Sequence, residues 1–293
     1  MQSDKAWTVD ETRAWELVLA VKAQADRVLR AESPVSESGY TVGPLTVSAT
    51  GHWRSRGPVT LAAEHLFNLF LPLCASGRPF ALAQIGQSLD GRIATETGVS
   101  HYINGADGLT HLHRLRAIVD AVVVGTGTAV ADDPQLTVRN CPGESPVRVV
   151  IDRQRRVPDS HQLFQDAQAP TLRLVRGHTE SNNALVEDIA LPRHADGDCP
   201  VTVILDLLAE RGLHRVLIEG GGDTVSRFVS AGALDYLHVI VAPMIIGSGR
   251  PGFTLPTLDT LEHALRPTCQ SVNLGTDVLF ALDLRSTGQM TTD

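Results

Sequence analysis

Lysine is almost absent from this chain. Of its 25 basic residues, Lys5 and Lys22 are the only lysines, and the rest are arginines. Beyond Lys22, therefore, no lysine can form a Schiff base with a carbonyl substrate, which excludes that chemistry from the main body of the chain. Any phosphate held by a cationic side chain there must be held by arginine, whose planar fork suits phosphate oxygens. The net charge of −8 argues against nonspecific nucleic-acid binding.

Long apolar runs and cysteine pairs are also missing. No stretch of about 18 apolar residues occurs, so we expect no membrane span. Residues 1–11 carry acidic side chains and lack the apolar segment of a signal peptide. The four cysteines are scattered without a C-x-x-C pair, at Cys74, Cys141, Cys199 and Cys269. This usage is typical of free thiols, and it predicts a cytoplasmic protein with neither a disulfide framework nor a zinc site.

From residue 79 onward, strand and helix patterns alternate. At 293 residues and 43% apolar composition, the chain can bury a substantial core. Buried-strand patterns occupy residues 80–85, 121–124, 147–151, 172–175, 213–218, 237–242 and 279–284, and helical patterns occupy residues 109–118 and 201–211. Residues 178–197 are polar and are expected to be irregular. The order predicts an α/β fold with a mostly parallel central sheet, antiparallel C-terminal strands and flanking helices.

The first 78 residues carry no recognisable chemistry. Apolar residues recur at helical spacing in 1–30, residues 31–43 have the composition of a loop, and residues 61–74 have a helical pattern up to Pro72. We therefore divide the chain into an N-terminal extension of unknown role, residues 1–78, and a main domain, residues 79–293.

Two glycine-bearing turns in the main domain connect a strand to a helix. One follows the strand that ends at Glu219, where three glycines precede Asp223 or Thr224 as a helix N-cap. The other follows residues 121–124 and opens a short helix ending near Asp132. A helix N-terminus with open backbone N–H groups favours anions, and glycines allow close approach. Together, the two turns predict a dinucleotide site, because ligands lie beyond the carboxyl ends of strands in α/β sheets.

Metal sites are less favoured. His111 and His113 are two residues apart, so they lie on different faces of a helix and make a poor metal pair. Asp132 and Asp133 suit magnesium chemically, but before a proline at the end of a short helix a capping role fits better. We expect no bound metal.

Several motifs then point to a family. Residues 84–94 have the sequence QIGQSLDGRIA, residues 131–139 have ADDPQLTVR, and residues 219–221 have EGG. Shorter matches are HRLR at 113–116 and GTGT at 125–128. Residues 79–285 resemble the pyrimidine reductase of riboflavin biosynthesis, which in many bacteria is the C-terminal half of a bifunctional deaminase–reductase. The resemblance implies a dihydrofolate-reductase-like fold, here without the deaminase half.

The resemblance also implies an activity: an NADPH-dependent hydride transfer to C1′ of a ring-opened phosphoribosylaminopyrimidine. It places cofactor contacts on Gly86, Tyr102, Thr128, Asp132 and residues 221–227, and the two turns extend these to Gly125, Thr126, Gly220, Gly221, Gly222, Asp223 and Thr224. Substrate contacts are expected at Ser88, Ser100, Arg116, Leu136, Arg139 and Glu219. Glu219, Gln84 and Asp90 are the candidate catalytic residues. A homodimer is expected from the family.

Two residues depart from the family pattern. Gln84 stands where the family usually has a lysine, and it cannot supply charge or a proton at neutral pH. Arg153 stands where a small hydroxyl residue is common, and its guanidinium suits the 2′-phosphate of NADPH or a place facing solvent. Two alternatives therefore stay open: a related reductase of a pterin-like substrate, and a catalytically silent nucleotide-binding protein.

Overall fold

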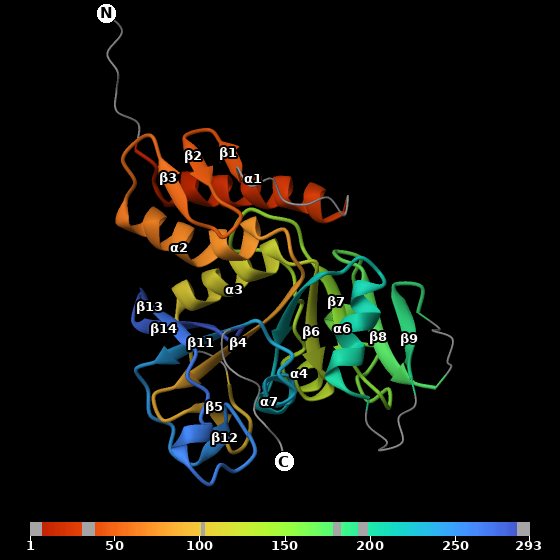
Figure 1. Cartoon of the computed structure of the whole chain (residues 1–293). Helices are drawn as coiled ribbons and strands as arrows, with labels where there is room; N and C mark the ends of the chain where they lie inside the picture. The colour runs from red at the N-terminus through yellow and green to blue at the C-terminus, as the bar shows by residue number, and fades with distance from the viewer. Residues whose placement is uncertain (1–7, 31–38, 101–102, 178–182, 193–198, 286–293) are drawn as a thin grey trace, which may run out of the picture. The chain divides into compact units, whose positions relative to one another are not determined.

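The fold was analysed in a computed structural model of the whole chain (Figure 1). It describes residues 8–30, 39–100, 103–177, 183–192 and 199–285. The chain forms two compact units, Met1–Pro79 and Phe80–Asp293. In the described residues, no helix combines the length and apolarity needed to cross a membrane.

The first unit packs two helices together, α1 (Glu11–Arg30) and α2 (Leu61–Ala75), and adds a small antiparallel sheet. Trp15 of α1 meets Phe70 of α2 edge to face, with ring centroids 5.2 Å apart. Thr60 caps α2 by accepting a hydrogen bond from the Ala63 amide. Pro72 lies inside α2 and does not end it as the sequence suggested. The sheet order is β1 (Tyr40–Val42), β2 (Leu45–Val47), β3 (Trp53–Ser55).

The second unit is built on a nine-stranded sheet. Its strand order is β13-β14-β11-β4-β10-β6-β7-β8-β9. The strands are β4 (Phe80–Ser88), β6 (Ala121–Gly125), β7 (Val147–Ile151), β8 (Thr171–Arg176), β9 (Val186–Leu191), β10 (Arg215–Glu219), β11 (Tyr236–Ala242), β13 (Thr268–Leu274) and β14 (Asp277–Asp283). Strands β11 to β9 run parallel, and β14 and β13 pair antiparallel at the other edge. The predicted mostly parallel sheet with antiparallel C-terminal strands is therefore confirmed.

Helices cover both faces of this sheet. They are α3 (Ala106–Ile118), α4 (Thr126–Asp132), α5 (Gln162–Gln165), α6 (Val201–Ala209) and α7 (Gly222–Ser230); a 3₁₀ turn, η1 (Leu261–His263), and a two-stranded sheet of β5 (Arg92–Thr95) and β12 (Gly249–Pro251) complete the unit. Alternate residues of a strand point to opposite faces. Ile218 packs into the core with Ile204 of α6 and Phe228 of α7, whereas Glu219 contacts α3. All five residues of β10 are buried, as both faces are covered.

Two strands of the nine-stranded sheet were not predicted. Residues 178–197 were expected to be irregular, but Val186–Leu191 form the edge strand β9. Its polar Asp188 is buried because Arg173 of β8 binds it, with Nε–Oδ1 at 2.8 Å. The pattern of β9 thus includes a paired charge at a position where apolar periodicity would require a hydrophobic residue. Strand β13 was missed because most of its side chains are at least partly exposed, so it carries no apolar period.

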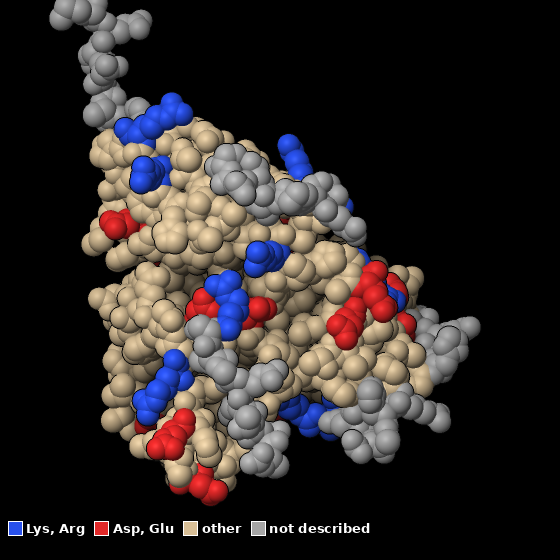
Figure 2. All heavy atoms as spheres, viewed as in Figure 1, with Lys and Arg blue, Asp and Glu red and all other residues tan. Residues whose placement is uncertain are grey.

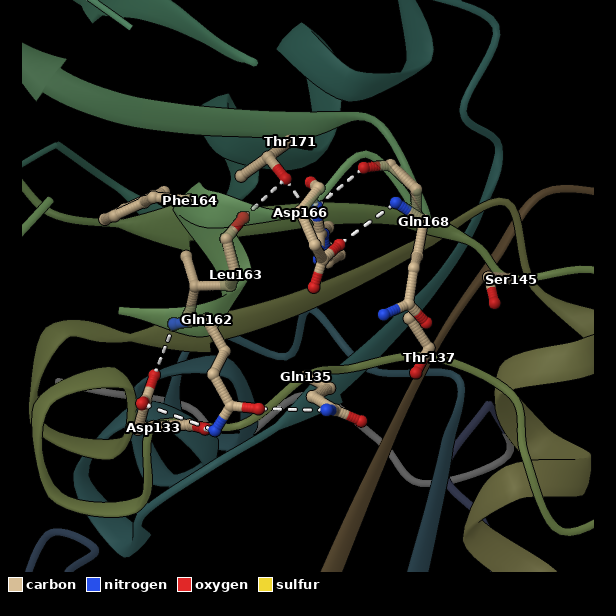
Figure 3. A network of polar contacts seen from close by, with 12 residues as sticks. Asp133, Gln135, Thr137, Ser145, Gln162, Leu163, Phe164, Asp166, Gln168 and Thr171 are labelled. Carbon is tan, nitrogen blue, oxygen red and sulfur yellow. Dashed lines mark hydrogen bonds and ion pairs between the residues drawn. The ribbon is translucent and has the colours of Figure 1, made fainter. Parts of the chain in front are cut away.

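The segment after α4 is anchored to α5 by polar contacts (Figure 3). Asp133 adopts a left-handed conformation, with φ of 38°. Its Oδ1 accepts a hydrogen bond of 2.8 Å from the backbone N–H of Gln162. Gln135 Nε2 donates to Gln162 Oε1 at 2.9 Å. Leu136, with φ of 55°, follows and is buried. The helix-flanking role predicted for Asp133 holds, and these contacts fix the path of the chain toward Thr137.

Candidate active site

A cavity of about 1230 Å³ opens over the carboxyl ends of the parallel strands. Four neighbouring strands line it: β4 through Gln84 in its middle, and β10, β6 and β7 through their last residues, Glu219, Gly125 and Ile151. Helix α3 contributes a stripe of residues one turn apart, including Leu112 and Arg116. The site therefore lies where ligands of open α/β sheets bind.

The two glycine turns meet at this cavity. The Gly221 amide donates a hydrogen bond of 2.8 Å to Thr128 Oγ1, and a Cβ on Gly125 would lie 2.4 Å from Thr224 Oγ1. Strands β10 and β6 are neighbours, which brings the turns at their ends together. Gly220 has φ of 154°, a conformation that side chains rarely adopt. Both turns line the cavity side by side, as a dinucleotide site requires.

Helix α7 begins earlier than the sequence suggested. Its N-cap is Gly221 and its first residue is Gly222, so Asp223 and Thr224, the predicted N-caps, lie within the first turn. Gly221 has extended torsions, φ −65° and ψ 161°, as an N-cap residue does. Gly222 is required here because a Cβ would lie 2.5 Å from the Pro251 carbonyl oxygen. The backbone N–H groups at the start of α7 are thus part of the cavity wall.

Arg116 and Glu219 form a bidentate ion pair at the centre of the site. Arg116 Nε and Nη2 each donate to one Glu219 carboxylate oxygen at 2.7 Å, and Nη1 donates to the Thr137 carbonyl at 3.0 Å. Both side chains are buried. Burial by itself lowers the pKa of Arg116, but the Glu219 carboxylate outweighs burial and raises it. The Arg116 side chain points into the interior, as its place beside the apolar stripe of α3 suggested, and its guanidinium group contacts Glu219.

A buried histidine pair lies on the same face of the sheet. His238 of β11, Gln84 of β4 and Glu219 of β10 are register partners on adjacent parallel strands. His238 Nδ1 lies 2.9 Å from Nε2 of His111 on α3, and the two rings stack. Burial lowers the pKa of His238 to about 4, and it lowers that of His111 well below its usual value, assisted by the neighbouring charges of His238 and Arg114. Both imidazoles are therefore neutral at physiological pH.

Sequence reasoning missed this pair. The sequence invited a comparison of His111 with His113, but the two histidines have different partners. His111 pairs with His238, whereas His113 Nδ1 accepts a hydrogen bond of 2.9 Å from the backbone N–H of Arg139. The only sequence signal was a lone histidine within the apolar strand YLHVIVA. Such a residue needs a buried partner, but the sequence does not indicate which one.

Asp90 and Ser88 are placed apart from the cavity lining. Asp90 accepts hydrogen bonds from Ser88 Oγ at 2.5 Å and from the amides of Ile246 and Gly247 at 3.1 and 2.7 Å. These bonds, that of Ser88 first, lower the pKa of Asp90 to about 2. Neither side chain is among the residues lining the cavity. Their contacts join the turn after β4 to the turn after β11.

Of the other residues expected to contact the substrate, two line the cavity and one does not. Leu136 and Ser100 line the cavity, and Ser100 Oγ donates to Asp132 Oδ1 at 3.4 Å. Arg139 is not among the lining residues, and its Nη1 donates to Thr137 Oγ1 at 2.7 Å. Burial and then the charge of Arg116 lower the pKa of Arg139, so the two cations are close. Tyr102, an expected cofactor contact, lies outside the described residues.

One end of the cavity is rich in arginine. Arg153 follows β7, Arg176 ends β8 and Arg227 belongs to α7, and all three line the cavity. Burial lowers the pKa of Arg153, and so do the nearby charges of Arg227 and Arg176. Thr126 Oγ1 donates to the Ile151 carbonyl at 2.7 Å, which ties the segment before Arg153 to the first glycine turn. Arg153 was singled out in the sequence, and Arg227 closes the segment 221–227 that was expected to contact the cofactor, whereas Arg176 was not predicted.

On the face drawn in Figure 2, the coloured Lys and Arg side chains are not concentrated as they are at the arginine-rich end of the cavity. On the face in Figure 2, Lys and Arg side chains stand in separate places, with Asp and Glu between several of them. Among the side chains coloured there, they form no continuous basic surface. The mixture of signs on this face agrees with the negative net charge of −8.

Comparison with known proteins assigns the family. Residues 79–280 match the model described as RibD C-terminal domain. The chain belongs to this family. A RibD-family relative named 2,5-diamino-6-ribosylamino-4(3H)-pyrimidinone 5′-phosphate reductase, from Methanothermobacter thermautotrophicus, is 38% identical over 216 residues, covering 69% of this chain and 96% of the relative. The riboflavin biosynthesis protein RibD of Aquifex aeolicus is 32% identical over 219 residues, covering 74% of this chain and 61% of that protein.

Solved structures of the RibD family share the fold. RibD from Acinetobacter baumannii superposes with a TM-score of 0.64 at 26% identity, covering 79% of this chain and 65% of that one. The Saccharomyces cerevisiae riboflavin biosynthesis reductase Rib7 superposes with a TM-score of 0.59 at 21% identity, covering 70% and 90% of the two chains. The chain thus spans less than two thirds of the length of these two RibD proteins, and 96% and 90% of the two proteins named as reductases. The dihydrofolate-reductase-like fold expected from the motifs is confirmed.

Proposed function

We propose that this protein is a reductase of riboflavin biosynthesis that reduces a phosphorylated ribosylaminopyrimidine with a nicotinamide cofactor. The observation that carries the proposal is the meeting of two features in one cavity: the paired glycine turns and the buried Arg116–Glu219 pair. A dinucleotide site and a polar substrate site then share one space. The archaeal reductase that this chain matches over 96% of its length supports the same activity.

The residues present suit a dinucleotide. The diphosphate would lie over the two turns, where Gly127 has no neighbouring atom within 4 Å of a Cβ position and the N-terminus of α7 presents backbone N–H groups. At the arginine end, Arg153, Arg176 and Arg227 suit a further phosphate, which favours NADPH over NADH. When bound, the cofactor supplies the hydride.

The protein's own part is binding, orientation and charge. The substrate would react as its ring-opened imine, which accepts a hydride at C1′ and a proton at nitrogen to give a ribitylamine. Glu219 would accept hydrogen bonds from the pyrimidine, and Arg116 would hold that carboxylate in place. Arg139, close to Arg116, remains our proposed ligand of the substrate phosphate. Fixing the two reactants in this geometry is the main catalytic contribution we assign to the chain.

The experiment is cofactor oxidation followed by absorbance, with purified full-length protein and the phosphorylated ribosylaminopyrimidine. Turnover that depends on this substrate supports the proposal. Turnover with dihydropterins alone would assign the chain to a pterin reductase, and cofactor binding without turnover of any of these compounds would make it a silent binding protein. Gln168→Leu, an exposed change outside the cavity, serves as a control that should match the wild type.

We also propose that the protein is a homodimer, as expected from the family. Light scattering coupled to size exclusion measures the mass directly, and a monomeric mass at micromolar concentration would contradict this assignment.

A further inference from the structure

Asn104 precedes α3, and its side chain lies against strand β4 in the wall of the cavity. Its Nδ2 donates to Asp277 Oδ2 at 3.2 Å and to the Ile240 carbonyl at 3.4 Å. Its Oδ1 lies over Gly86, where an added Cβ would be 1.7 Å from that oxygen. The opposite orientation of the amide would set Oδ1 against two acceptors, a carboxylate and a carbonyl, and is disfavoured. The carbonyl end of Asn104 is therefore the end that faces β4.

Asp277 fixes this orientation. Its side chain is buried, and its Oδ2 also accepts a hydrogen bond of 2.8 Å from the backbone N–H of Gly105, the N-cap residue of α3. Asp277 begins β14 and lies 173 positions from Asn104 in the chain. One carboxylate oxygen thus holds both the start of α3 and the Asn104 amide. Among the residues that the structure describes, Asn104 Oδ1 accepts no hydrogen bond, so it is available to a ligand.

Beside Asn104, strand β4 extends past one of its two neighbours. It pairs with β10 only as far as Gln84, but with β11 as far as Ser88. The edge of Ile85 and Gly86 on the side of β10 therefore borders the cavity, and both residues line it. Because Gly86 has no side chain, the Asn104 carbonyl occupies the place that a Cβ would take. A flat polar group at this edge meets an acceptor whose direction is fixed.

The strand order indicates which part of a dinucleotide reaches this edge. Arg153 follows β7 and Arg176 ends β8, the glycine turns follow β6 and β10, and β4 is the next strand. A phosphate at the arginines and a diphosphate over the turns leave β4 to the nicotinamide. Four strand spacings separate β8 from β4, which corresponds to roughly 19 Å. The carboxamide of the nicotinamide ring carries two N–H donors, and Asn104 Oδ1 is the acceptor beside it.

We propose that Asn104 binds the carboxamide of the nicotinamide and that Asp277 is its positioning residue. The inference rests on the proposed function and specifies how the chain holds the reacting ring. The Asn104 carbonyl accepts one carboxamide N–H and so restrains rotation of the ring about its bond to the ribose. One face of the ring is then presented to the substrate, which is the orientation that hydride transfer requires.

The test is calorimetric titration of the full-length protein with NADP⁺ and with its 3-acetylpyridine analogue, in the absence of substrate. The analogue carries a methyl group in place of the carboxamide NH₂, so it cannot donate to Asn104. We expect NADP⁺ to bind roughly 5- to 30-fold more tightly, because the analogue leaves one acceptor without a partner. Equal affinities, or tighter binding of the analogue, would overturn the inference and leave the reductase proposal intact. Binding of neither nucleotide would overturn both.

Variants at two positions locate the preference. Asn104→Leu removes the acceptor at similar volume, so we expect the ratio of the two affinities to fall to about twofold or less, through weaker binding of NADP⁺. Asp277→Ala releases the amide and should also lower the ratio, whereas Asp277→Asn keeps an acceptor for Asn104 and should preserve it. Asn273→Leu, an exposed change outside the cavity, is the matched control and should keep the wild-type ratio.

The unfolding temperature identifies variants that are damaged in folding. If Asn104→Leu does not fold, Asn104→Ala removes the same acceptor without adding volume and gives the same measurement. A folded variant at position 104 that keeps the wild-type ratio would refute the role of Asn104. A purely structural Asp277 would weaken both nucleotides equally in Asp277→Ala, and that result would refute its positioning role.

Discussion

Arg116 and Glu219 are joined by two hydrogen bonds of 2.7 Å although 103 positions separate them in the chain. One lies in the last turn of α3 and the other ends β10, so the pair connects the helix to the sheet in the wall of the cavity. Because both are buried, each charge depends on the other for its stability. The pair is thus a structural connection as well as part of the proposed substrate site.

Removing one partner should destabilise the protein more than removing both. Arg116→Met leaves the Glu219 carboxylate buried without its cation, and we expect a loss of about 3–5 kcal/mol in the free energy of unfolding. The double variant Arg116→Met/Glu219→Met should recover much of that loss. Urea unfolding of the wild type, both single variants and the double variant measures the coupling. Additive losses would mean that the pair does not hold α3 on the sheet.

Arg153 should decide between the two nicotinamide cofactors. Arg153→Ser removes one charge-assisted contact to a 2′-phosphate, which corresponds to a rise of roughly 10- to 100-fold in KM for NADPH. The KM for NADH should change little, because that cofactor lacks the phosphate. Steady-state kinetics with each cofactor measures the two KM values. The control Arg211→Ser removes an exposed arginine paired with Glu187 and should alter neither value. Equal changes for NADPH and NADH would place the phosphate elsewhere.

Two glycines of the turns should respond differently to alanine. At Gly222 an added Cβ would meet the Pro251 carbonyl at 2.5 Å, so Gly222→Ala should lower the unfolding temperature and weaken cofactor binding together. At Gly127 an added Cβ meets no protein atom within 4 Å. Gly127→Ala should therefore keep its unfolding temperature and lose cofactor affinity only if the cofactor approaches that turn. Fluorescence titration and calorimetry separate the effects, and unchanged affinity in Gly127→Ala would place the diphosphate away from that turn.

The histidine pair should make stability depend on pH. His111 and His238 have pKa values lowered by burial, that of His238 from 6.5 to about 4. Below pH 6.5 the unfolded chain binds protons that the folded protein does not, so stability is full above that pH and declines toward pH 4, by up to about 1.4 kcal/mol per pH unit for each histidine.

The variant His111→Phe/His238→Phe measures the contribution of this pair. It should flatten the decline in urea midpoints between pH 7 and 4.5, because phenylalanine takes up no proton. His113, whose pKa burial also lowers to about 4, keeps part of the slope, as Arg116 and Arg139 stand near it. A variant with the wild-type slope would show that the pair does not control the acid response.

Much of the fold followed from sequence because the signals are local. The strand that ends at Gly125 is wholly apolar, and the one that ends at Glu219 has three consecutive apolar residues. Glycines follow both, so the strands and the helices after them were predictable. Strand β9 was not, because its ion pair with β8 replaces apolar periodicity. The start of α7 was set two to three residues late, since steric contact with Pro251 lies outside the local pattern.

The candidate site, like the fold, combines features that the sequence determines with features that only the tertiary structure determines. Sequence by itself determined the residue types available to the site: the glycines after two strands, Gln84 and Glu219 in strand patterns, and Arg116 beside a helical stripe. It also determined the near absence of lysine, which leaves phosphate binding to arginine. Only the tertiary structure decided their partners. The sheet order places β4 between β11 and β10, and this order sets Gln84 beside Glu219, His238 against His111, and the two turns in contact. Such pairings depend on strand register and helix packing across 93 residues or more, which no local pattern encodes.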